Sequence, residues 1–236
     1  MVAVVLVHGL YHRPEHFAVL AESLRTAGTE VFVPELHRGS LLADTAAVQA
    51  VIDALHEPPI VLGHSYGGSV ITGLRGAGHL VYLAAFVPDA GESAAGLGGA
   101  SAQLRDAIRP EPDGWTSLHP DRAAAILYGD CPEPLAAWAV DLLRAQAPGC
   151  GRGVPEHHGW KRTPSTYVVC ARDRAIDPGL QRRMASRCTD AHEWRTGHSP
   201  FVGQPGLIRE LLRNVSHPSS RTGHRVPGPA WPGRRR

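Results

Sequence analysis

Short apolar runs recur along most of this chain, separated by turn residues and by segments with helical spacing. Runs that stay apolar at every position, such as Val4-Val5-Leu6-Val7 and Ile60-Val61-Leu62, suit strands that are buried on both faces. The pattern predicts an α/β fold, with helices on both faces of a sheet of about six mostly parallel strands. We expect these strands near residues 2–7, 30–33, 60–64, 79–83, 166–170 and 191–194.

Residues 88–160 form a long insertion between the fourth and fifth of these strands. A segment of this length inside a compact domain should carry its own structure. Helical patches lie near 101–108 and 120–127, and the clearest helix runs from Glu133 to Gln146 with its large apolar residues on one face. We interpret the insertion as a small helical lid on a core formed by residues 1–87 and 161–213.

Residues 214–236 differ in composition from the rest of the chain. Pro, Gly, Ser and Arg dominate, the hydrophobic periodicity stops, and the sequence closes with Arg234-Arg235-Arg236. Such a composition predicts a disordered basic tail. Its charge is compatible with binding to nucleic acid or to a membrane, but a solvated tail is the simpler interpretation.

The most informative motif is Gly63-His64-Ser65-Tyr66-Gly67, which directly follows the apolar run of residues 60–62. It matches the nucleophile elbow, in which a serine sits in a strained strand-to-helix turn and glycines on either side let strand and helix approach closely. The alternative is an ordinary glycine-rich turn with an exposed serine. The small residues that follow, Gly68-Ser69-Val70, suit a helix packed tightly on the sheet and favour the elbow.

A serine nucleophile needs a histidine to take its proton and a carboxylate to orient that histidine. The chain has 14 histidines, and position singles out His198, on a loop just after the last predicted strand. Asp173, in the loop after the strand near 166–170, best fits the acid. Asp177 precedes Pro178 and is better explained as a helix N-cap. Asp89 or Glu92, after the fourth strand, is the alternative acid.

These motifs together resemble the α/β-hydrolase superfamily, close to the small serine esterases that include plant methyl esterases, hydroxynitrile lyases and their bacterial relatives. The resemblance extends from about Val2 to Leu212. It is carried by His8-Gly9, by Gly63-His64-Ser65-Tyr66-Gly67-Gly68, by Val81-Tyr82-Leu83-Ala84-Ala85-Phe86, by the Asp173 loop with Gln181-Arg182, and by Gly197-His198-Ser199-Pro200-Phe201.

The resemblance implies an oxyanion hole formed by the backbone N–H groups of Leu10 and Tyr66. One departure is informative. The plant hydroxynitrile lyases carry a lysine beside the catalytic histidine, where this chain has Ser199, and its one lysine is Lys161. Cyanide chemistry is therefore disfavoured. A serine nucleophile, in place of the aspartate or cysteine of other members, favours cleavage of an ester, thioester, lactone or amide.

We therefore predict a serine esterase that cleaves a small, largely apolar carboxylic ester through an acyl-enzyme. Aromatic and polar residues near the site and in the lid are candidates for substrate binding: Tyr11, His12, Trp115, Tyr128, Trp138 and Trp160. For each aromatic residue of the lid, a purely structural role is the simpler alternative. Two other functions share the same residues, namely a binding protein with little turnover and an acyl transferase.

One competing motif, His12-Arg13-Pro14-Glu15-His16, matches a zinc pattern. Zinc-binding histidines of this type lie on one face of a continuous helix, and Pro14 fits only the first turn of a helix. We expect no metal and no cofactor.

Charge and composition exclude few functions. A chain of 236 residues with 43% hydrophobic content suits one domain, and a formal charge of +2 gives no electrostatic case for nucleic acid. No run reaches the length needed to span a bilayer, and Met1 leads straight into a strand, so we expect a cytoplasmic protein with reduced cysteines. The sequence leaves the oligomeric state open.

Overall fold

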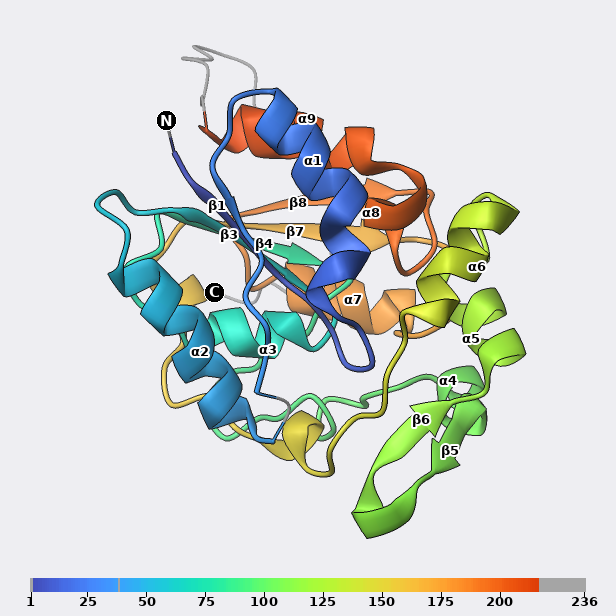
Figure 1. Cartoon of the computed structure of the whole chain (residues 1–236). Helices are drawn as coiled ribbons and strands as arrows, with labels where there is room; N and C mark the ends of the chain where they lie inside the picture. The colour runs from blue at the N-terminus through green and yellow to red at the C-terminus, as the bar shows by residue number, and fades with distance from the viewer. Residues whose placement is uncertain (1, 38, 217–236) are drawn as a thin grey trace.

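The computed structural model describes residues 2–37 and 39–216 and contains a six-stranded parallel sheet (Figure 1). All six expected strands form, and each pairs in parallel with its neighbours in the order β2-β1-β3-β4-β7-β8. Their bounds are β1 Val4–Val7, β2 Val31–Phe32, β3 Ile60–His64, β4 His79–Leu83, β7 Ser165–Cys170 and β8 Asp190–Trp194. The predicted α/β sheet is confirmed.

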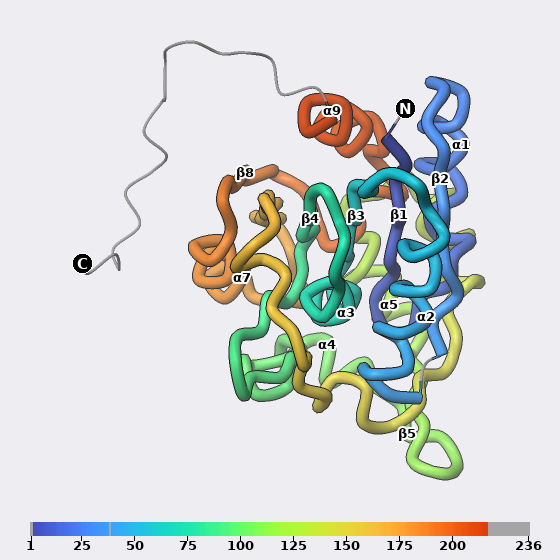
Figure 2. The backbone as a smooth tube through the Cα atoms, turned by 90° about the vertical axis from the view of Figure 1, so that its left-hand side faces the viewer, coloured from blue at the N-terminus to red at the C-terminus, as the bar shows by residue number. Residues whose placement is uncertain are grey.

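Alternate residues of the central strands contribute their side chains to two separate hydrophobic cores. Val4 and Leu6 belong to one core, and Val5 and Val7 belong to the other, because successive side chains of a strand point to opposite faces. Figure 2 shows helices on both sides of the strands. The first core includes α1 Ala18–Thr26, α8 Pro200–Gly203 and α9 Pro205–Ser216, and the second includes α2 Leu41–Asp53, α3 Gly67–Thr72 and α7 Pro178–Ala185.

The insertion after β4 is not purely helical, contrary to the sequence-based expectation. It contains α4 Ala102–Ala107, α5 Pro120–Leu127 and α6 Glu133–Asp141, and also a hairpin of β5 Ile108–Pro110 and β6 Thr116–Leu118. In Figure 1 it lies to one side of the sheet, with α6 next to α8. Four short 3-10 helices complete the fold: η1 Pro14–Phe17, η2 Pro112–Gly114, η3 Cys150–Arg152 and η4 Gly159–Lys161.

The prediction of a helix from Glu133 to Gln146 is wrong in its last five residues. Helix α6 ends at Asp141, because the backbone beyond it bonds to other segments. The Arg144 N–H donates to the Tyr11 carbonyl at 3.0 Å, and Gln146 exchanges two backbone hydrogen bonds with Thr116. At the other end of the chain, α9 continues to Ser216, three residues into the predicted tail, and the rest of that tail lies outside the described residues.

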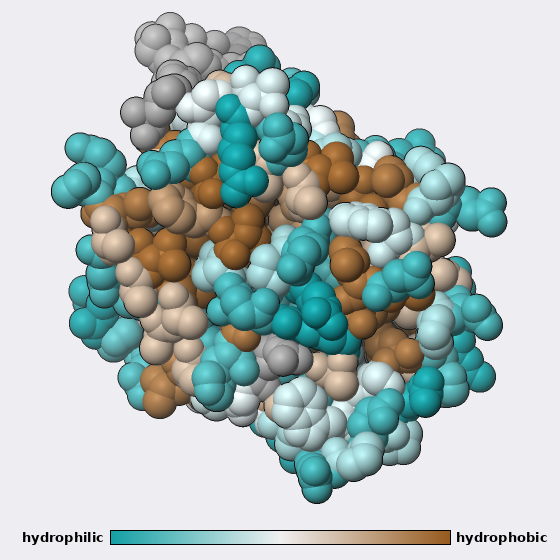
Figure 3. All heavy atoms as spheres, viewed as in Figure 1, coloured by the Kyte–Doolittle hydropathy of each residue, from teal (hydrophilic) through white to brown (hydrophobic). Residues whose placement is uncertain are grey.

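The molecular surface seen in Figure 3 mixes hydrophilic and hydrophobic residues without one dominant apolar face. Large apolar side chains such as Val19 and Leu207 are exposed one at a time, which is ordinary for a folded chain. Among the described helices, none has the length and apolar character needed to cross a membrane.

Glycines at the start of α3 allow strand, turn and helix to meet backbone to backbone. A Cβ atom on Gly67 would overlap the Val7 carbonyl oxygen, and one on Gly68 would overlap the Phe86 carbonyl oxygen. The Val7 carbonyl belongs to β1 and the Phe86 carbonyl to the buried segment after β4, and neither backbone group can move aside as the end of a flexible side chain can. The sequence therefore needs glycine at both positions for α3 to lie this close to the sheet.

We predict that Gly68→Ala lowers the free energy of unfolding by about 1–3 kcal/mol, the usual range for forcing extra volume into a packed interior. Gly151→Ala is the matched control, since no heavy atom lies within 4 Å of a Cβ built there, and it should change stability by less than about 0.5 kcal/mol. Urea denaturation of both variants checks this. If the two variants were equally stable, the close backbone contact at Gly68 would not be needed for stability.

Candidate active site

The predicted functional residues follow the carboxyl ends of four strands of one parallel sheet. Leu10 follows β1, Ser65 follows β3, Asp173 follows β7 and His198 follows β8. Since the carboxyl ends of parallel strands lie at the same edge, the fold brings these loops together at the usual binding edge of such sheets.

Ser65 occupies the sharp turn between β3 and α3. Its φ of 55° lies in the left-handed region, which is uncommon for a residue with a side chain and costs roughly 1–3 kcal/mol. Hydrogen bonds hold it there: its N–H donates to the Leu83 carbonyl at 3.2 Å, and its carbonyl accepts from the N–H of Phe86 at 3.1 Å. Ser65 is partly exposed, whereas His64 and Tyr66 on either side are buried. The turn therefore presents the serine out of the sheet.

The loop after β1 passes directly beside this serine. A Cβ atom built on Gly9 would lie 2.9 Å from the Ser65 Cβ, so the next residue, Leu10, is close to the nucleophile. Within residues 2–37 and 39–216, the backbone N–H groups of Leu10 and Tyr66 make no backbone hydrogen bond outside the regular elements. The Tyr66 hydroxyl donates to buried Asp44 at 2.7 Å, which fixes this residue from the opposite side.

His198 and Asp173 form a buried, hydrogen-bonded pair. The His198 Nδ1 lies 2.7 Å from Asp173 Oδ2, and the side chains are 2% and 0% exposed. Because a carboxylate only accepts, Nδ1 carries a proton, and Nε2 of the neutral ring is left as the basic nitrogen. The other carboxylate oxygen, Oδ1, accepts from the N–H groups of Ala175 at 2.7 Å and Ile176 at 3.0 Å. This arrangement orients the imidazole and fixes its tautomer.

Gln181 supports the acid, a role that the sequence interpretation missed. Its Nε2 donates to Asp173 Oδ2 at 2.7 Å, and its Oε1 accepts the Cys170 N–H at 2.9 Å. The side chain is fully buried. It lies on the same buried face of helix α7 as Leu180 and Met184. A polar residue on the buried face of an amphipathic helix is the signal that could have identified it.

The alternative acids take part in other interactions. Asp89 pairs with Lys161, whose hydrogen bond to it lowers the Asp89 pKa, and Glu92 pairs with Arg187, which lowers the Glu92 pKa in the same way. Asp177 caps α7, where its side chain accepts the Leu180 N–H at 2.9 Å. Of the carboxylates considered from the sequence, Asp173 is the one bonded to His198.

His64, directly before the serine, is a second residue whose role the sequence interpretation missed. It is fully buried, its ring centroid lies 4.5 Å from that of His198, and its Nε2 donates to the His198 carbonyl at 3.0 Å. Burial lowers the pKa of His64 well below its usual 6.5, and the neighbouring His198 lowers it further. A neutral imidazole therefore ties the strand of the nucleophile to the loop of the base.

The two histidines of the zinc-like motif are buried with their ring nitrogens engaged. The His12 Nδ1 lies 2.8 Å from the Leu10 carbonyl, and its Nε2 lies 3.0 Å from the Tyr128 hydroxyl. The His16 Nδ1 accepts the Arg13 N–H at 2.9 Å, and its Nε2 donates to the Ala139 carbonyl at 3.0 Å. Both rings therefore join the loop after β1 to the insertion.

The aromatic residues proposed for substrate binding do not form one cluster. Tyr11 is buried, and its hydroxyl lies 3.0 Å from Thr116 Oγ1. Trp138 packs on the core that contains α1, with its ring 6.4 Å from His16. Trp160 packs on the core that contains α2, α3 and α7, and its Nε1–H donates to the Pro88 carbonyl at 3.1 Å. Trp115 is half-buried in the β5–β6 hairpin. The two cores lie on opposite faces of the sheet, so these residues belong to different regions.

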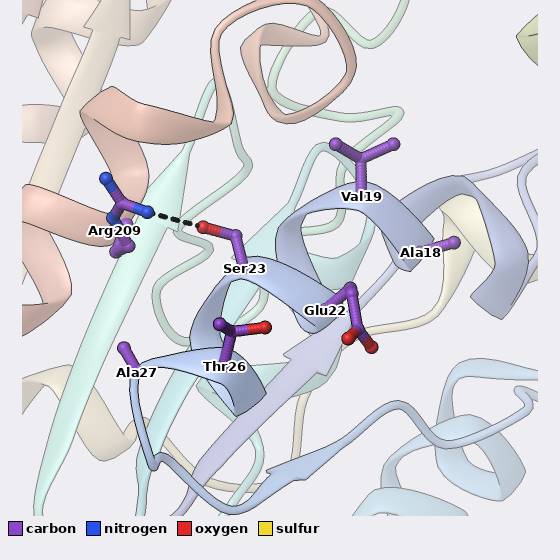
Figure 4. Close-up of a pocket in the computed structure, with 7 residues that line it drawn as sticks. All are labelled: Ala18, Val19, Glu22, Ser23, Thr26, Ala27 and Arg209. Atoms are coloured by element: carbon purple, nitrogen blue, oxygen red, sulfur yellow. Dashed lines mark hydrogen bonds between the residues drawn. The ribbon is translucent and has the colours of Figure 1, made fainter.

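A shallow hollow of about 690 Å³ on the outer side of α1 is not the candidate site. Figure 4 shows Arg209 of α9 reaching across it to Ser23, and the two are hydrogen-bonded at 2.9 Å. None of its lining residues belongs to the loops that carry Ser65, Asp173 or His198. The hollow is lined by Ala18, Val19, Glu22, Ser23, Thr26, Ala27 and Arg209.

Comparison with known protein families and sequences identifies the family of this chain. The model of the alpha/beta hydrolase family matches residues 4–211. The chain is 30% identical to the alpha/beta hydrolase nvfD of Aspergillus novofumigatus, over 91% of this chain and 96% of that protein. It is 28% identical to a carbendazim hydrolyzing esterase of a Nocardioides species, over 88% of this chain and 97% of that protein.

Solved structures confirm the fold. A pyrethroid hydrolase from Sphingobium faniae superposes with a TM-score of 0.81 at 19% identity, covering 91% of this chain and 97% of that one. A methylesterase from Arabidopsis superposes with a TM-score of 0.77 at 18% identity, covering 92% and 99%. At these identities the likeness concerns the fold, which is the one that the sequence motifs predicted.

We predict that the protein loses stability as the pH falls from 6.5 toward 4. Burial lowers the pKa of His16 from 6.5 to about 4. Between these values the unfolded chain binds more protons than the folded chain, so the free energy of unfolding decreases as the pH decreases. His16 alone contributes up to about 3 kcal/mol to this change. Urea denaturation at a series of pH values measures it.

The variant His16→Gln should show a shallower dependence of stability on pH than the unsubstituted protein. His192→Gln is the control, because His192 is exposed on β8, and it should reproduce the original dependence. Identical pH dependences for all three proteins would contradict the assignment of this effect to His16.

Proposed function

Because the chain belongs to the alpha/beta hydrolase family, we propose that it is a serine esterase that cleaves a small, largely apolar carboxylic ester through an acyl-enzyme. The observation that carries the proposal is the buried pair of His198 and Asp173, 2.7 Å apart, at the edge of the sheet where Ser65 turns outward. Relatives and structural neighbours named as esterases or ester hydrolases support a carboxylic ester as the substrate class.

In the proposed mechanism Ser65 attacks the ester carbonyl while His198 removes its proton. The bond between Ser65 Oγ and the carbonyl carbon forms, and the carbonyl oxygen becomes an oxyanion that accepts hydrogen bonds from the N–H groups of Leu10 and Tyr66. When the oxyanion collapses, the carbon–oxygen bond to the leaving alcohol breaks, and the alcohol takes the proton from His198. Water, activated by His198, then releases the acid and restores Ser65.

The surroundings of His198 suit the positive charge that it carries during this reaction. Asp173 accepts from it directly, so the imidazolium forms next to a carboxylate. His64 and His12 are buried, and burial lowers the pKa of both rings well below 6.5. Both rings are therefore uncharged at neutral pH and do not repel the imidazolium, although the rings of His64 and His198 are only 4.5 Å apart.

We propose that residues 88–160 are the lid of this site. The Tyr128 hydroxyl bonds His12, and the Arg144 Nε donates to the His12 carbonyl at 3.0 Å. The Asp130 carboxylate accepts the N–H of Gly197, the residue before His198, at 2.5 Å. The insertion thus touches both the loop of Leu10 and the loop of the base, which gives it a position from which to limit the acyl and alcohol groups that enter.

We predict that Ser65→Ala loses at least about 10⁴-fold in kcat for p-nitrophenyl esters, because no other group replaces the nucleophile. Ser69→Ala is the matched control. Ser69 lies in α3, and its hydroxyl is buried without a hydrogen-bond partner among the described residues. Loss of this hydroxyl should leave kcat within twofold of the original value, which corresponds to about 0.4 kcal/mol in the activation free energy. A chain-length series of esters measures both effects and sizes the acyl pocket.

Covalent labelling by a fluorophosphonate separates the possible outcomes. An esterase labels at Ser65 and turns over. Labelling without turnover would favour a binding protein or an acyl transferase in place of an esterase, and unchanged turnover in Ser65→Ala would refute the proposed mechanism.

We predict that Asp173→Asn lowers kcat by about 10²–10⁴-fold, because an amide in this position favours the wrong tautomer of His198. Asp177→Asn changes the same residue type four positions along the loop, and asparagine caps a helix as well as aspartate does. It should keep kcat within about twofold. If both substitutions have the same effect, Asp173 is not the orienting acid.

A further inference from the structure

A chain of hydrogen bonds leads from the lid to the loop that holds Leu10. The hydroxyl of Tyr128, at the end of α5, lies 3.0 Å from His12 Nε2, and His12 Nδ1 lies 2.8 Å from the Leu10 carbonyl. Tyr128 is 1% exposed and His12 is 2% exposed. The polar atoms of both residues are therefore directed at each other and at the loop, and both side chains are buried.

The donors and acceptors of these hydrogen bonds follow from their chemistry. A carbonyl oxygen accepts only, so His12 Nδ1 carries the proton that it donates to Leu10. Burial, together with the neighbouring rings of His16 and His64, lowers the His12 pKa, so the ring is neutral and its Nε2 is bare. Tyr128 must then be the donor to Nε2, and burial raises the Tyr128 pKa, which keeps that hydroxyl protonated. Each proton along this path therefore has one position.

The loop that receives these bonds is strained, and the lid holds it at a second point. Tyr11 has a φ of 65°, in the left-handed region that a non-glycine residue rarely adopts. Its carbonyl accepts the Arg144 N–H at 3.0 Å, and Arg144 also pairs with Glu35. A strained conformation persists only where the surrounding structure fixes it. Much of that restraint comes here from residues of the lid.

We infer that Tyr128 and His12 are positioning residues, which fix the Leu10 carbonyl and, through it, the orientation of residue Leu10, whose N–H lies in the preceding peptide unit and points at the oxyanion. The inference rests on the proposed function, since it concerns the oxyanion hole of that site. The lid then has a second role, because it completes the catalytic machinery as well as covering it. Oxyanion donors act on the transition state more than on the bound ester, so loss of the lid contact should lower kcat and leave KM nearly unchanged.

The substitution Tyr128→Phe removes the hydroxyl and keeps the ring. We expect kcat for p-nitrophenyl butyrate to fall about tenfold, as for the loss of one buried hydrogen bond, with KM within about twofold. Tyr82→Phe is the matched control: Tyr82 is equally buried, its hydroxyl lies 3.1 Å from Thr72 Oγ1, and it lies outside the site. Titration with a fluorophosphonate gives the concentration of intact active sites. Because kcat is calculated from that concentration, unfolded protein does not lower it.

Two substitutions of His12 test the direction of these hydrogen bonds. Asn places an N–H near the position of Nδ1 and can still donate to the Leu10 carbonyl, whereas Ala cannot. We expect His12→Asn to recover most of the kcat that His12→Ala loses. The inhibition constant of an alkyl trifluoromethyl ketone, which forms an oxyanion on the serine, should rise by the same factor as kcat falls. A purely structural role would not produce this proportionality.

The outcomes separate this inference from the proposed function. Turnover that persists in Ser65→Ala would overturn both. Turnover that requires Ser65, but is equal in Tyr128→Phe and Tyr82→Phe, would overturn the positioning role alone. A rise in KM with unchanged kcat in Tyr128→Phe would also overturn it, since this result would place Tyr128 against the substrate instead of behind the oxyanion loop.

Discussion

The close backbone packing around Ser65 is the constraint on which the rest of the site depends. Ser65 adopts a positive φ, and two glycines after it place their Cα atoms against the carbonyls of Val7 and Phe86. The same contact brings the loop after β1 beside the serine, because Gly9 has no Cβ to separate them. The local strain is offset by hydrogen bonds from neighbouring strands and by burial of β3 on both faces. Ser65 and the loop after β1 are thus positioned by a single packing arrangement.

Around this turn the protein uses neutral imidazole rings as buried hydrogen-bonding groups. His64 bonds the His198 carbonyl after β8, His12 bonds the Leu10 carbonyl after β1, and His16 bonds the Ala139 carbonyl of α6. A neutral imidazole offers one donor and one acceptor in fixed directions, so it can join two backbone segments without placing a charge in the core. The neutral rings around His198 are compatible with the proposal that His198 takes the proton of Ser65.

The sequence predicts the sheet and the hydrogen-bonded pair of Asp173 and His198, because both depend on local patterns. Apolar runs identify the central strands β1, β3 and β4, whereas β8 is mostly polar and exposed, and the position of Asp173 after β7 identifies the residue that bonds His198. The roles of Gln181 and His64 depend on contacts between segments distant in the chain, which no local pattern records. The end of α6 escapes prediction for the same reason, because residues beyond Asp141 bond to the loop after β1 and to the hairpin.

We propose that the acyl group of the ester is transferred to Ser65 during turnover. Rapid acid quenching of the reaction with a p-nitrophenyl ester, followed by peptide mass mapping, tests it most directly. We expect a mass increase equal to the acyl group on the peptide that contains Ser65, formed within the first turnover and lost as the ester is exhausted. Turnover without any acylated Ser65 peptide, or with the acyl group on another residue, would contradict it.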